Sequence, residues 1–420
     1  MKIKEAVATL EGLQRFPGRP GLGRVKKMLS LLGNPEKVTT YVHVTGTNGK
    51  GSTSAMVASA LQAAGYKVGL FTSPHLHRIN ERIKVQGWDI SDNDFVFYVS
   101  KIKKLLRKNP HIRPAMFEAL TVMAFLYFAD QKIDVAVLEV GMGGRYDATN
   151  VIKNSVAVIT NIDLEHREVL GNTKAKIAVQ KAGIIKRKST VIVGEQNKNL
   201  QKIFEREIRK NKAKMVFLKP RELKFLKQSS EGQVFHFEQY KKLQIPLLGR
   251  YQLHNAALAI LAVRALNERG FNVSEEALRK GLRSVYWPLR LERVHSKPDI
   301  ILDAGHNLHG VKAVVKTIDQ VFPRRGRILI LGCSVDKPFK EMSKILATLS
   351  KVIIVTKAKY HGAKPKEILE AIQTPKKIFF VTSTVRQALA LAQKMARKKS
   401  LILVLGGLYL AAEAEEALLD

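Results

Sequence analysis

The sequence is poor in cysteine and in long apolar runs. Cys333 is the one cysteine among 420 residues, so an intramolecular disulfide is excluded, and the apolar run at 328–331 predicts a buried thiol without a catalytic role. No apolar run reaches the ~18 residues that a membrane-spanning helix needs, and the nearest, at 401–412, is interrupted by two glycines. Residues 1–5 contain no apolar signal region. We therefore expect a soluble, cytoplasmic protein without a membrane partner.

Acidic and aromatic residues are also scarce. The chain has 71 Lys and Arg against 36 Asp and Glu, a net charge of +35. Such an excess suits nucleic acid, a membrane surface or small polyanions. Aromatic residues make up only 7% of the chain, which is too few for the interleaved pattern that stacks on bases. We expect a generally basic surface that attracts anionic small molecules, and no nucleic-acid partner.

Strands alternate with helices along the chain, which predicts an α/β protein with mainly parallel sheets. Most of the expected strands are continuous apolar runs, typical of strands covered on both faces. In the first half they lie at 39–44, 67–72, 134–140, 155–159 and 190–193. Helices are expected at 54–64, 118–129, 173–182 and 252–266, with a small antiparallel addition at 234–237 and 243–247.

A second series of strands begins after the rhythm breaks near 286–290. These strands are expected at 300–302, 328–331, 352–355, 378–381 and 401–405. Two domains are expected, because a single core seldom grows past about 250–300 residues. We predict a P-loop domain with a three-layer parallel sheet over 1–285, a linker over 286–296, and a smaller Rossmann-like α/β domain over 297–420. The active site should lie at the carboxyl ends of the strands and in the cleft between the domains.

The segment HVTGTNGKGST at 43–53 carries the strongest functional signal. A strand, a glycine-rich turn and a helix in this order form a phosphate cradle, because backbone N–H groups and the helix dipole face the anion. Lys50 can reach the outer phosphates, and Ser52 or Thr53 can face Mg²⁺. The common P-loop pattern is not matched, since Val44 stands at the first glycine position and Gly51 separates Lys50 from Ser52. The segment nevertheless predicts nucleotide chemistry rather than a plain strand-to-helix turn.

Single polar residues at other strand ends are weaker signals. Glu139 could face Mg²⁺ or be a solvated residue at a strand exit, and Ser73 could be a metal ligand or part of a Ser-Pro turn. His166 could act in the site or be structural, and Lys181 could simply complement a helix dipole. Asp303 could act in the site or cap a helix.

Taken in order, these segments resemble folylpolyglutamate synthase and the bifunctional dihydrofolate synthase of the Mur-ligase superfamily. The matching segments span nearly the whole chain: HVTGTNGKGST at 43–53, FTSPHL at 71–76, LEVGMGGRYDATN at 138–150, NIDLEHREVLGNT at 161–173, KAGI at 181–184, HNAA at 254–257, DAGHN at 303–307 and GGLYL at 406–410. The resemblance implies ATP-dependent amide formation, in which a carboxylate becomes an acyl phosphate that the glutamate amine attacks. Catalysis is then mainly positioning and charge neutralisation.

The resemblance also implies roles for individual residues. The ATP contacts would be Gly49, Lys50, Gly51, Ser52, Asn255, Arg290 and Asp303, and the Mg²⁺ ligands Ser73, Glu139 and His166. The catalytic group would be Lys50, Glu139, His166 and Lys181, of which the last matches a lysine that the family carbamylates. The pterin-binding segments would be Ala115, Met116, Phe117 and Glu118 together with Tyr146, Asp147 and Ala148, and His306 would line the cleft for the incoming glutamate.

Three residues depart from the family pattern. Glu165 stands where the family has Asp, which would shift His166. Leu289 stands where the family has Gly, which would stiffen the hinge and change the pose of Arg290. Gly407 stands where Ser is common, which would loosen a contact with glutamate. Since none of these changes removes a metal or phosphate group, we expect an active enzyme.

The expected substrates are L-glutamate with dihydropteroate, with reduced folates, or with both. Two alternatives remain at this point: a Mur-type amide ligase acting on a peptidoglycan-like carboxylate, and a basic P-loop ATPase stimulated by nucleic acid. A monomer is expected, because the ATP contacts come from both domains of one chain.

Overall fold

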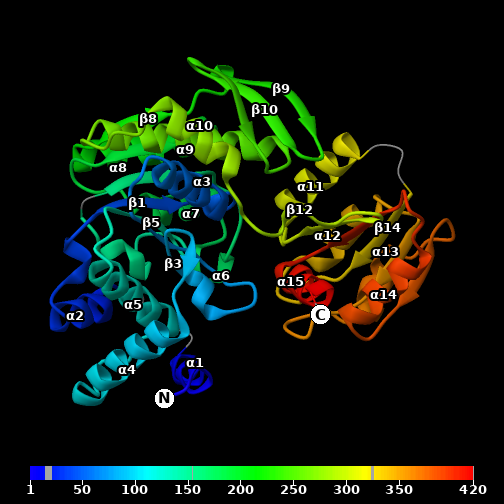
Figure 1. Ribbon diagram of the computed structural model, residues 1–420, viewed down its shortest axis with the longest axis horizontal. Coiled ribbons are helices and arrows are strands. Elements are labelled where there is room, and N and C mark those ends of the chain that lie inside the picture. Colours follow the sequence, from blue (N-terminus) through cyan, green and yellow to red (C-terminus); the bar gives the residue numbers. More distant parts are fainter. Residues whose placement is uncertain (15–20, 154, 323–325, 420) are drawn as a thin grey trace. The chain divides into compact units, whose positions relative to one another are not determined.

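The computed structural model describes residues 1–14, 21–153, 155–322 and 326–419, and the chain divides into two compact units. The first unit comprises Met1–Lys224, His236–Leu243 and Leu253–Val285, and the second comprises Phe225–Phe235, Gln244–Gln252 and Tyr286–Asp420. In Figure 1 the elements of the first unit run from blue to green, and the main sheet and helices of the second run from yellow to red.

The first unit is built on an eight-stranded sheet, counted over the described residues, in the order β4-β3-β2-β5-β1-β6-β7-β8. Neighbouring strands from β2 to β8 are parallel, whereas β3 and β4 form an antiparallel edge. The strands are β1 (Thr40–Thr45), β2 (Val68–Phe71), β3 (Ile83–Val85), β4 (Trp88–Asp89), β5 (Val135–Glu139), β6 (Ser155–Ile159), β7 (Thr190–Val193) and β8 (Lys214–Phe217). The central strands β1, β5 and β6 are buried along almost their whole length, as expected for strands covered on both faces.

Helices cover both faces of this sheet, which gives the three predicted layers. They are α1 (Ile3–Glu11), α2 (Gly23–Leu31), α3 (Lys50–Ala63), α4 (Asp92–Lys108), α5 (Met116–Asp130), α6 (Arg167–Leu170), α7 (Lys174–Ala182), α8 (Lys198–Asn211), α9 (Arg250–Asn267) and α10 (Glu275–Ser284). Side chains of β1, β2 and β5 pack with α4 and α5 in one core, and those of β6 and β7 pack with α7 and α8 in another. Helix α3 packs against β1, β2 and β5 and against α10.

The contact between α3 and α10 depends on a glycine. A Cβ at Gly281 would come within 2.4 Å of the Cα of Ala60, so the two helices can approach this closely only without a side chain there. The small residues of α3 also allow close packing, which this helix needs because it is buried on nearly every side.

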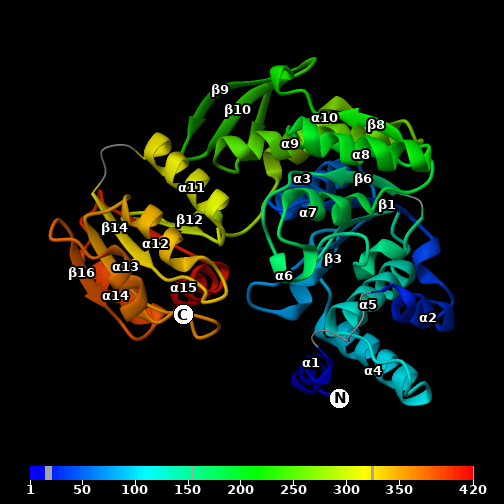
Figure 2. The same ribbon diagram turned by 180° about the vertical axis from the view of Figure 1, so that it is seen from behind.

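A separate three-stranded sheet has the order β11-β10-β9, with β9 (Leu223–Ser229), β10 (Gly232–Phe237) and β11 (Tyr240–Ile245). The two later strands correspond to the short strands that the sequence predicted, and β9 was not predicted. Figure 2 shows this sheet from behind.

The second unit contains a six-stranded sheet, within the described part of the chain, in the order β12-β13-β17-β14-β15-β16. Its strands are β12 (Arg290–His295), β13 (Asp299–Asp303), β14 (Arg327–Leu331), β15 (Val352–Val355), β16 (Ile378–Val381) and β17 (Leu401–Leu405). Helices α11 (Leu308–Val321), α12 (Phe339–Ala347) and α13 (Pro365–Ile372) share one core with it. Helices α14 (Val385–Met395) and α15 (Leu408–Leu419) pack together. Helix α14 contacts β14 and β15, and helix α15 contacts β13 and β17.

These two sheets confirm the predicted α/β class, and most predicted strands agree with the structure within one or two residues. One difference concerns the segment predicted as a linker, most of which forms β12 and pairs antiparallel with β13. Periodicity could not show this edge strand, since Leu291 and Val294 are the apolar residues of Arg290–His295 and they do not alternate regularly with polar ones. None of the helices in the described residues combines the length and the apolar character that crossing a lipid bilayer requires.

Candidate functional site

The P-loop joins the central strand β1 to helix α3, and two of its glycines are required by geometry. Gly46 and Gly49 have φ values of +149° and +82°, which lie in the region that favours glycine. A Cβ at Gly46 would lie 1.7 Å from Thr160 Oγ1, and a Cβ at Gly49 would lie 2.2 Å from Asn255 Oδ1. The loop is therefore held tightly between the end of β6 and helix α9. It leads into the N-terminus of α3, where backbone N–H groups can bind an anion.

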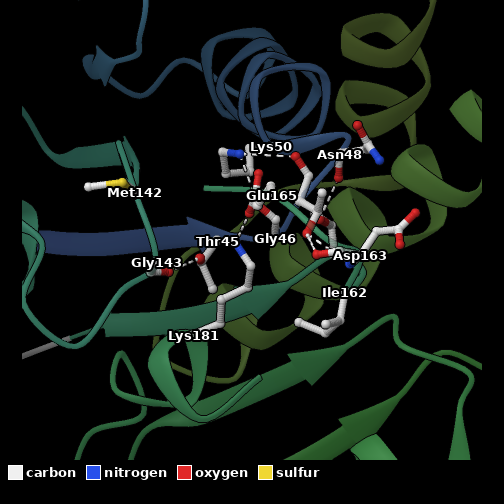
Figure 3. A network of polar contacts seen from close by, with 12 residues as sticks. Thr45, Gly46, Asn48, Lys50, Met142, Gly143, Ile162, Asp163, Glu165 and Lys181 are labelled. Atoms are coloured by element: carbon white, nitrogen blue, oxygen red, sulfur yellow. Dashed lines mark hydrogen bonds and ion pairs between the residues drawn. The ribbon is translucent and has the colours of Figure 1, made fainter. Parts of the chain in front are cut away.

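Polar contacts from the end of β6 fix the shape of this loop (Figure 3). Thr160 Oγ1 donates a hydrogen bond of 2.6 Å to the Asn48 carbonyl oxygen, and Asn48 N donates one of 2.8 Å to Asn161 Oδ1. Thr47 Oγ1 exchanges hydrogen bonds with the backbone of Asp163. Lys50 Nζ folds back over the loop and donates to the carbonyl oxygens of Gly46 and Thr47, at 2.8 and 3.1 Å. The ammonium of Lys50 thus lies where it can meet the phosphates of a nucleotide.

Ser73 and Glu139 lie together at the carboxyl ends of two adjacent strands. Ser73 N donates a hydrogen bond of 3.2 Å to Glu139 Oε2, and the Glu139 side chain is buried. A hydroxyl and a carboxylate are hard oxygen ligands of the kind that Mg²⁺ takes, usually with waters and substrate phosphates completing the shell. Among the described residues, no three His, Cys, Asp or Glu side chains gather into a group that could hold a metal ion.

His166 lies in the segment between β6 and α6. It is exposed, has a left-handed backbone with φ of +42°, and precedes the short helix α6. The residue before it, Glu165, accepts a hydrogen bond of 2.5 Å from Lys181 Nζ. Lys181 comes from the last turn of α7 and is 1% exposed, and Figure 3 shows the two side chains directed at each other.

Burial and nearby charges shift the pKa values of both members of this ion pair. Burial raises the pKa of Glu165, but the nearby ammonium groups of Lys50 and Lys181 outweigh it and lower the pKa to about 2. Burial lowers the pKa of Lys181 to about 8, against the opposing effect of Glu165. Glu165 is therefore an anion placed between two lysines, at a position where the sequence analysis saw only a longer side chain.

The pterin-type segment 115–118 begins helix α5. Glu118 accepts hydrogen bonds from Ala115 N at 2.8 Å and from Nε and Nη2 of Arg24 at 3.0 and 2.8 Å. Its carboxylate thus caps the helix and ties α2 to α5. Phe117 packs its ring 5.6 Å from that of Phe71, and the ring also lies against Gly141. Of these residues, Phe117 lies beside the strand ends that carry Ser73 and Glu139.

The second pterin-type segment belongs to the loop after β5. Tyr146 is 50% exposed, whereas Asp147 and Ala148 are buried. The Asp147 carboxylate accepts hydrogen bonds from Met142 N at 2.9 Å and from N and Oγ1 of Thr149 at 3.0 and 2.5 Å. Burial raises the pKa of Asp147, and these hydrogen bonds oppose the rise. The carboxylate therefore organises its own loop.

Three predicted site residues lie in the second unit, at or near the carboxyl end of β13. Asp303 accepts hydrogen bonds from Leu291 N at 3.0 Å and from Gly305 N at 2.7 Å, and Arg290 is its partner across the antiparallel pair. Burial raises the pKa of Asp303, with the Arg290 charge opposing. His306 is exposed in the loop that leads to α11.

The backbone beside Arg290 is unusual. Leu289 and Leu291 both have left-handed backbones, with φ values of +54° and +49°, and both side chains are buried. The family-type glycine position before Arg290 therefore does require a positive φ, and this chain meets the requirement with a leucine at a steric cost.

The structure gathers the P-loop, Asn255, Ser73, Glu139 and Lys181 within the first unit, and gathers Arg290 and Asp303 within the second. Sequence reasoning missed the partners that fix these groups: Arg24, His43, Thr149, Thr160 and the anionic role of Glu165. Arg24 and Glu118 are 94 residues apart, so no local pattern could pair them. A polar His43 inside an apolar strand was a signal that could have been used.

Comparison with protein-family models finds two matches. The Mur ligase middle domain matches residues 44–263, and the Mur ligase glutamate ligase domain matches residues 289–408. The first match covers the P-loop, Ser73, Glu139 and Lys181, and the second covers Arg290, Asp303 and His306.

Similar proteins and structures carry related names. The chain is 34% identical over 426 residues to the dihydrofolate synthase/folylpolyglutamate synthase of Bacillus subtilis, with 99% of each chain covered. Among solved structures, a Mycobacterium tuberculosis folylpolyglutamate synthase complexed with ADP has a TM-score of 0.89 at 31% identity, covering 99% of this chain and 98% of the other. Escherichia coli FolC in complex with DHPP and ADP has a TM-score of 0.87 at 30% identity, covering 100% and 98%.

Proposed function

This chain belongs to the Mur ligase family and to its folylpolyglutamate synthase branch, and from that premise we propose that it joins L-glutamate to dihydropteroate, to reduced folates, or to both. The reaction couples amide formation to ATP. A carboxylate oxygen of the acceptor attacks the γ-phosphorus, ADP leaves, and the resulting acyl phosphate is attacked by the amine of glutamate. The tetrahedral intermediate then expels phosphate, and the amine loses a proton.

The observation that carries this proposal is the Ser73–Glu139 pair beside a P-loop that has room only for glycine at positions 46 and 49. Backbone N–H groups of Gly49, Gly51 and Ser52, at the N-terminus of α3, would bind the phosphates. Lys50 would leave the carbonyl oxygens of the loop and neutralise charge on the transferring phosphoryl group. Asn255, which touches Gly49, would contact the nucleotide from α9.

A Mg²⁺ ion fits the same corner of the first unit. Ser73 and Glu139 supply the oxygen ligands, and His166 is the third proposed ligand, from the segment after β6. When bound, the cation would supply positive charge beside the phosphates and the acceptor carboxylate. The remaining protein groups bind and orient: Phe117 and Tyr146 would hold the pterin ring, and the loop around Asp147 and Ala148 would shape its pocket.

Lys181 is proposed as the site of carbamylation. Burial lowers its pKa to about 8, which increases the share of neutral amine able to react with carbon dioxide near neutral pH. The product would be an anion in place of an ammonium. Glu165 would then have to move away from this new negative charge, since it contacts Lys181 directly.

The second unit would supply the remaining contacts. Arg290 and Asp303 are proposed to contact ATP, and His306 to contact the incoming glutamate. We further propose that the enzyme is a monomer that acts in the cytoplasm, because its site draws on one chain and its reaction consumes ATP.

The test is phosphate release from ATP in the presence of Mg²⁺ and L-glutamate, with dihydropteroate and with tetrahydrofolate in parallel, and with the product mass read out. A gain of one glutamate on both acceptors would establish a bifunctional enzyme, and a gain on tetrahydrofolate alone would establish an elongation enzyme. ATP hydrolysis without a gain on either acceptor would overturn the proposal. Parallel reactions with a peptidoglycan-type carboxylate and with DNA or RNA would then separate the two remaining alternatives.

A further inference from the structure

A histidine lies inside the central strand of the main sheet. His43 in β1 is fully buried, between Leu138 of β5 and Ala157 of β6. An imidazole inside a sheet must be hydrogen-bonded to offset the loss of its hydration. None of the roles proposed above explains why a histidine occupies this position.

The hydrogen-bond partner of His43 is the side chain of Thr149, in the loop that follows β5. His43 Nε2 lies 2.8 Å from Thr149 Oγ1, and Thr149 Oγ1 lies 2.5 Å from Asp147 Oδ1. The carboxylate has no proton to give, so the Thr149 hydroxyl donates to Asp147. The hydroxyl must then accept from His43, which places the imidazole proton on Nε2. Hydrogen-bond direction therefore runs from His43 through Thr149 to Asp147.

Asp147 in turn closes the loop over residues 141–150. Its second oxygen accepts from Met142 N at 2.9 Å, so one carboxylate joins the start of the loop to its end. Thr45, two positions after His43 on the same face of β1, donates a hydrogen bond of 2.6 Å to the Gly143 carbonyl oxygen. The strand thus holds the loop at two points. Two side chains of the loop remain accessible to solvent: Tyr146 is exposed, and Arg145 is half-buried.

We propose that His43 is a positioning residue for the acceptor substrate: through Thr149 and Asp147 it fixes the loop over residues 141–150 in the shape that presents Arg145 and Tyr146 to the pterin. The identity of that substrate rests on the proposed function. The positioning itself does not, because it is a property of the chain without ligand.

The nucleotide half of the site should be independent of this chain of hydrogen bonds. The P-loop is shaped by Thr160, Asn161 and Asp163 from the end of β6, and none of these contacts passes through His43 or Thr149. Loss of the His43–Thr149 link should therefore affect the acceptor and not ATP.

Thr149→Val tests this, because valine keeps the shape of threonine and removes the hydroxyl. We expect amide hydrogen exchange in residues 141–150 of the full chain to accelerate at least about tenfold, since the hydroxyl makes two buried hydrogen bonds, to His43 and to Asp147, and both are lost. We also expect KM for the acceptor to rise about tenfold, while KM for ATP stays within about twofold. Thr149→Ser keeps the hydroxyl and should restore both values, and His43→Gln, which keeps an N–H donor, should lie between.

Ser155→Ala is the matched control. Ser155 is also buried in this sheet, but its hydroxyl has no hydrogen-bond partner among the described residues, so its loss should leave exchange in the loop unchanged. Unchanged exchange in Thr149→Val, or equal rises in both KM values, would overturn the inference. Accelerated exchange in a protein that adds glutamate to neither acceptor would instead leave the positioning intact and overturn the proposed function.

Discussion

At the scale of single residues, buried charge is the feature that most distinguishes this chain. Lys181 is almost completely buried, and its one ion-pair partner in the described structure is Glu165. Removing one member of such a pair leaves an uncompensated charge, which costs far more than the pair contributes.

Glu165→Gln is therefore expected to lower the free energy of unfolding by about 3 kcal/mol at pH 7. Urea denaturation followed by far-UV circular dichroism would measure the loss. Glu165→Asp, which keeps the charge on a side chain one methylene shorter, should recover most of it. Equal stabilities of Glu165→Gln and the unsubstituted protein would show that Lys181 does not depend on this carboxylate.

His43 should make the stability of the first unit depend on pH. Burial, with a contribution from Lys186, lowers its pKa to about 3 from an ordinary value near 6.5. Below pH 6.5 the unfolded chain binds a proton that the folded chain does not, so stability is complete above that pH and falls as the pH decreases toward 3. His75, whose pKa is lowered to about 4 by burial and by Arg82, acts in the same direction.

Between pH 7 and pH 5, proton binding to His43 in the unfolded chain lowers the free energy of unfolding by about 2 kcal/mol. His43→Gln should therefore lose about that much less stability than the unsubstituted chain over this interval, even if it is less stable at pH 7. Urea titrations at the two pH values measure the difference. Parallel losses in the two proteins would mean that His43 is protonated in the folded state.

At the scale of elements, two positions with a positive φ show how backbone conformation and side-chain packing compete. Leu289, before β12, has φ of +54° and a fully buried side chain. The strain is about 1–2 kcal/mol for a non-glycine residue, and the buried leucine contributes roughly 2–5 kcal/mol. Since the free energy of packing outweighs the strain, leucine at this position stabilises the second unit overall.

Leu289→Gly and Leu289→Ala separate the two effects. Both should destabilise the second unit through the lost side chain, but the glycine variant should be about 1 kcal/mol more stable than the alanine variant because it removes the strain. At ordinary helix or strand positions, where φ is negative, the alanine variant is the more stable of the two. An alanine variant as stable as the glycine variant, measured by thermal unfolding, would refute the strain.

The P-loop gives the second case, at the N-terminus of α3. Gly49→Ala should weaken ATP binding at least tenfold, since the new Cβ would collide with Asn255 and displace the loop. Gly65→Ala is the control: Gly65 also has a positive φ, +89°, but has no described atom within 4 Å of a built Cβ. Calorimetric titration with ADP should show a loss only in Gly49→Ala, and equal affinities would remove steric crowding as the reason for the glycine.

At the scale of the whole molecule, the net charge of +35 is the dominant property. Lysine and arginine side chains repel one another across the surface, and this repulsion opposes folding. Added salt screens it, because the Debye length falls from about 30 Å at 0.01 M to about 10 Å at 0.1 M. The melting temperature should therefore rise by several degrees when KCl increases over that range. A neutral osmolyte at equal osmolality is the control, and a fall in melting temperature with KCl would contradict the argument.

The sequence by itself determined the strands, the order of the motifs and the fold class. Apolar runs such as 155–159, 190–193 and 401–405 form strands with the predicted limits, because a strand covered on both faces must be apolar along its length. The strand, turn and helix of the P-loop were predicted correctly for a similar reason: a tight turn with positive φ and close neighbours needs glycine, and glycine is visible in the sequence.

Only the tertiary structure decided which side chains meet. Glu165 and Lys181, Arg24 and Glu118, and His43 and Thr149 are each brought together by the packing of separate elements, at separations that no local pattern records. The same packing directs the Asp147 carboxylate toward a backbone N–H group of its own loop. It also holds Leu289 at a positive φ, a conformation that glycine usually adopts. Periodicity reports the face that a residue occupies, whereas hydrogen-bond partners and backbone strain depend on what the rest of the chain places opposite that face.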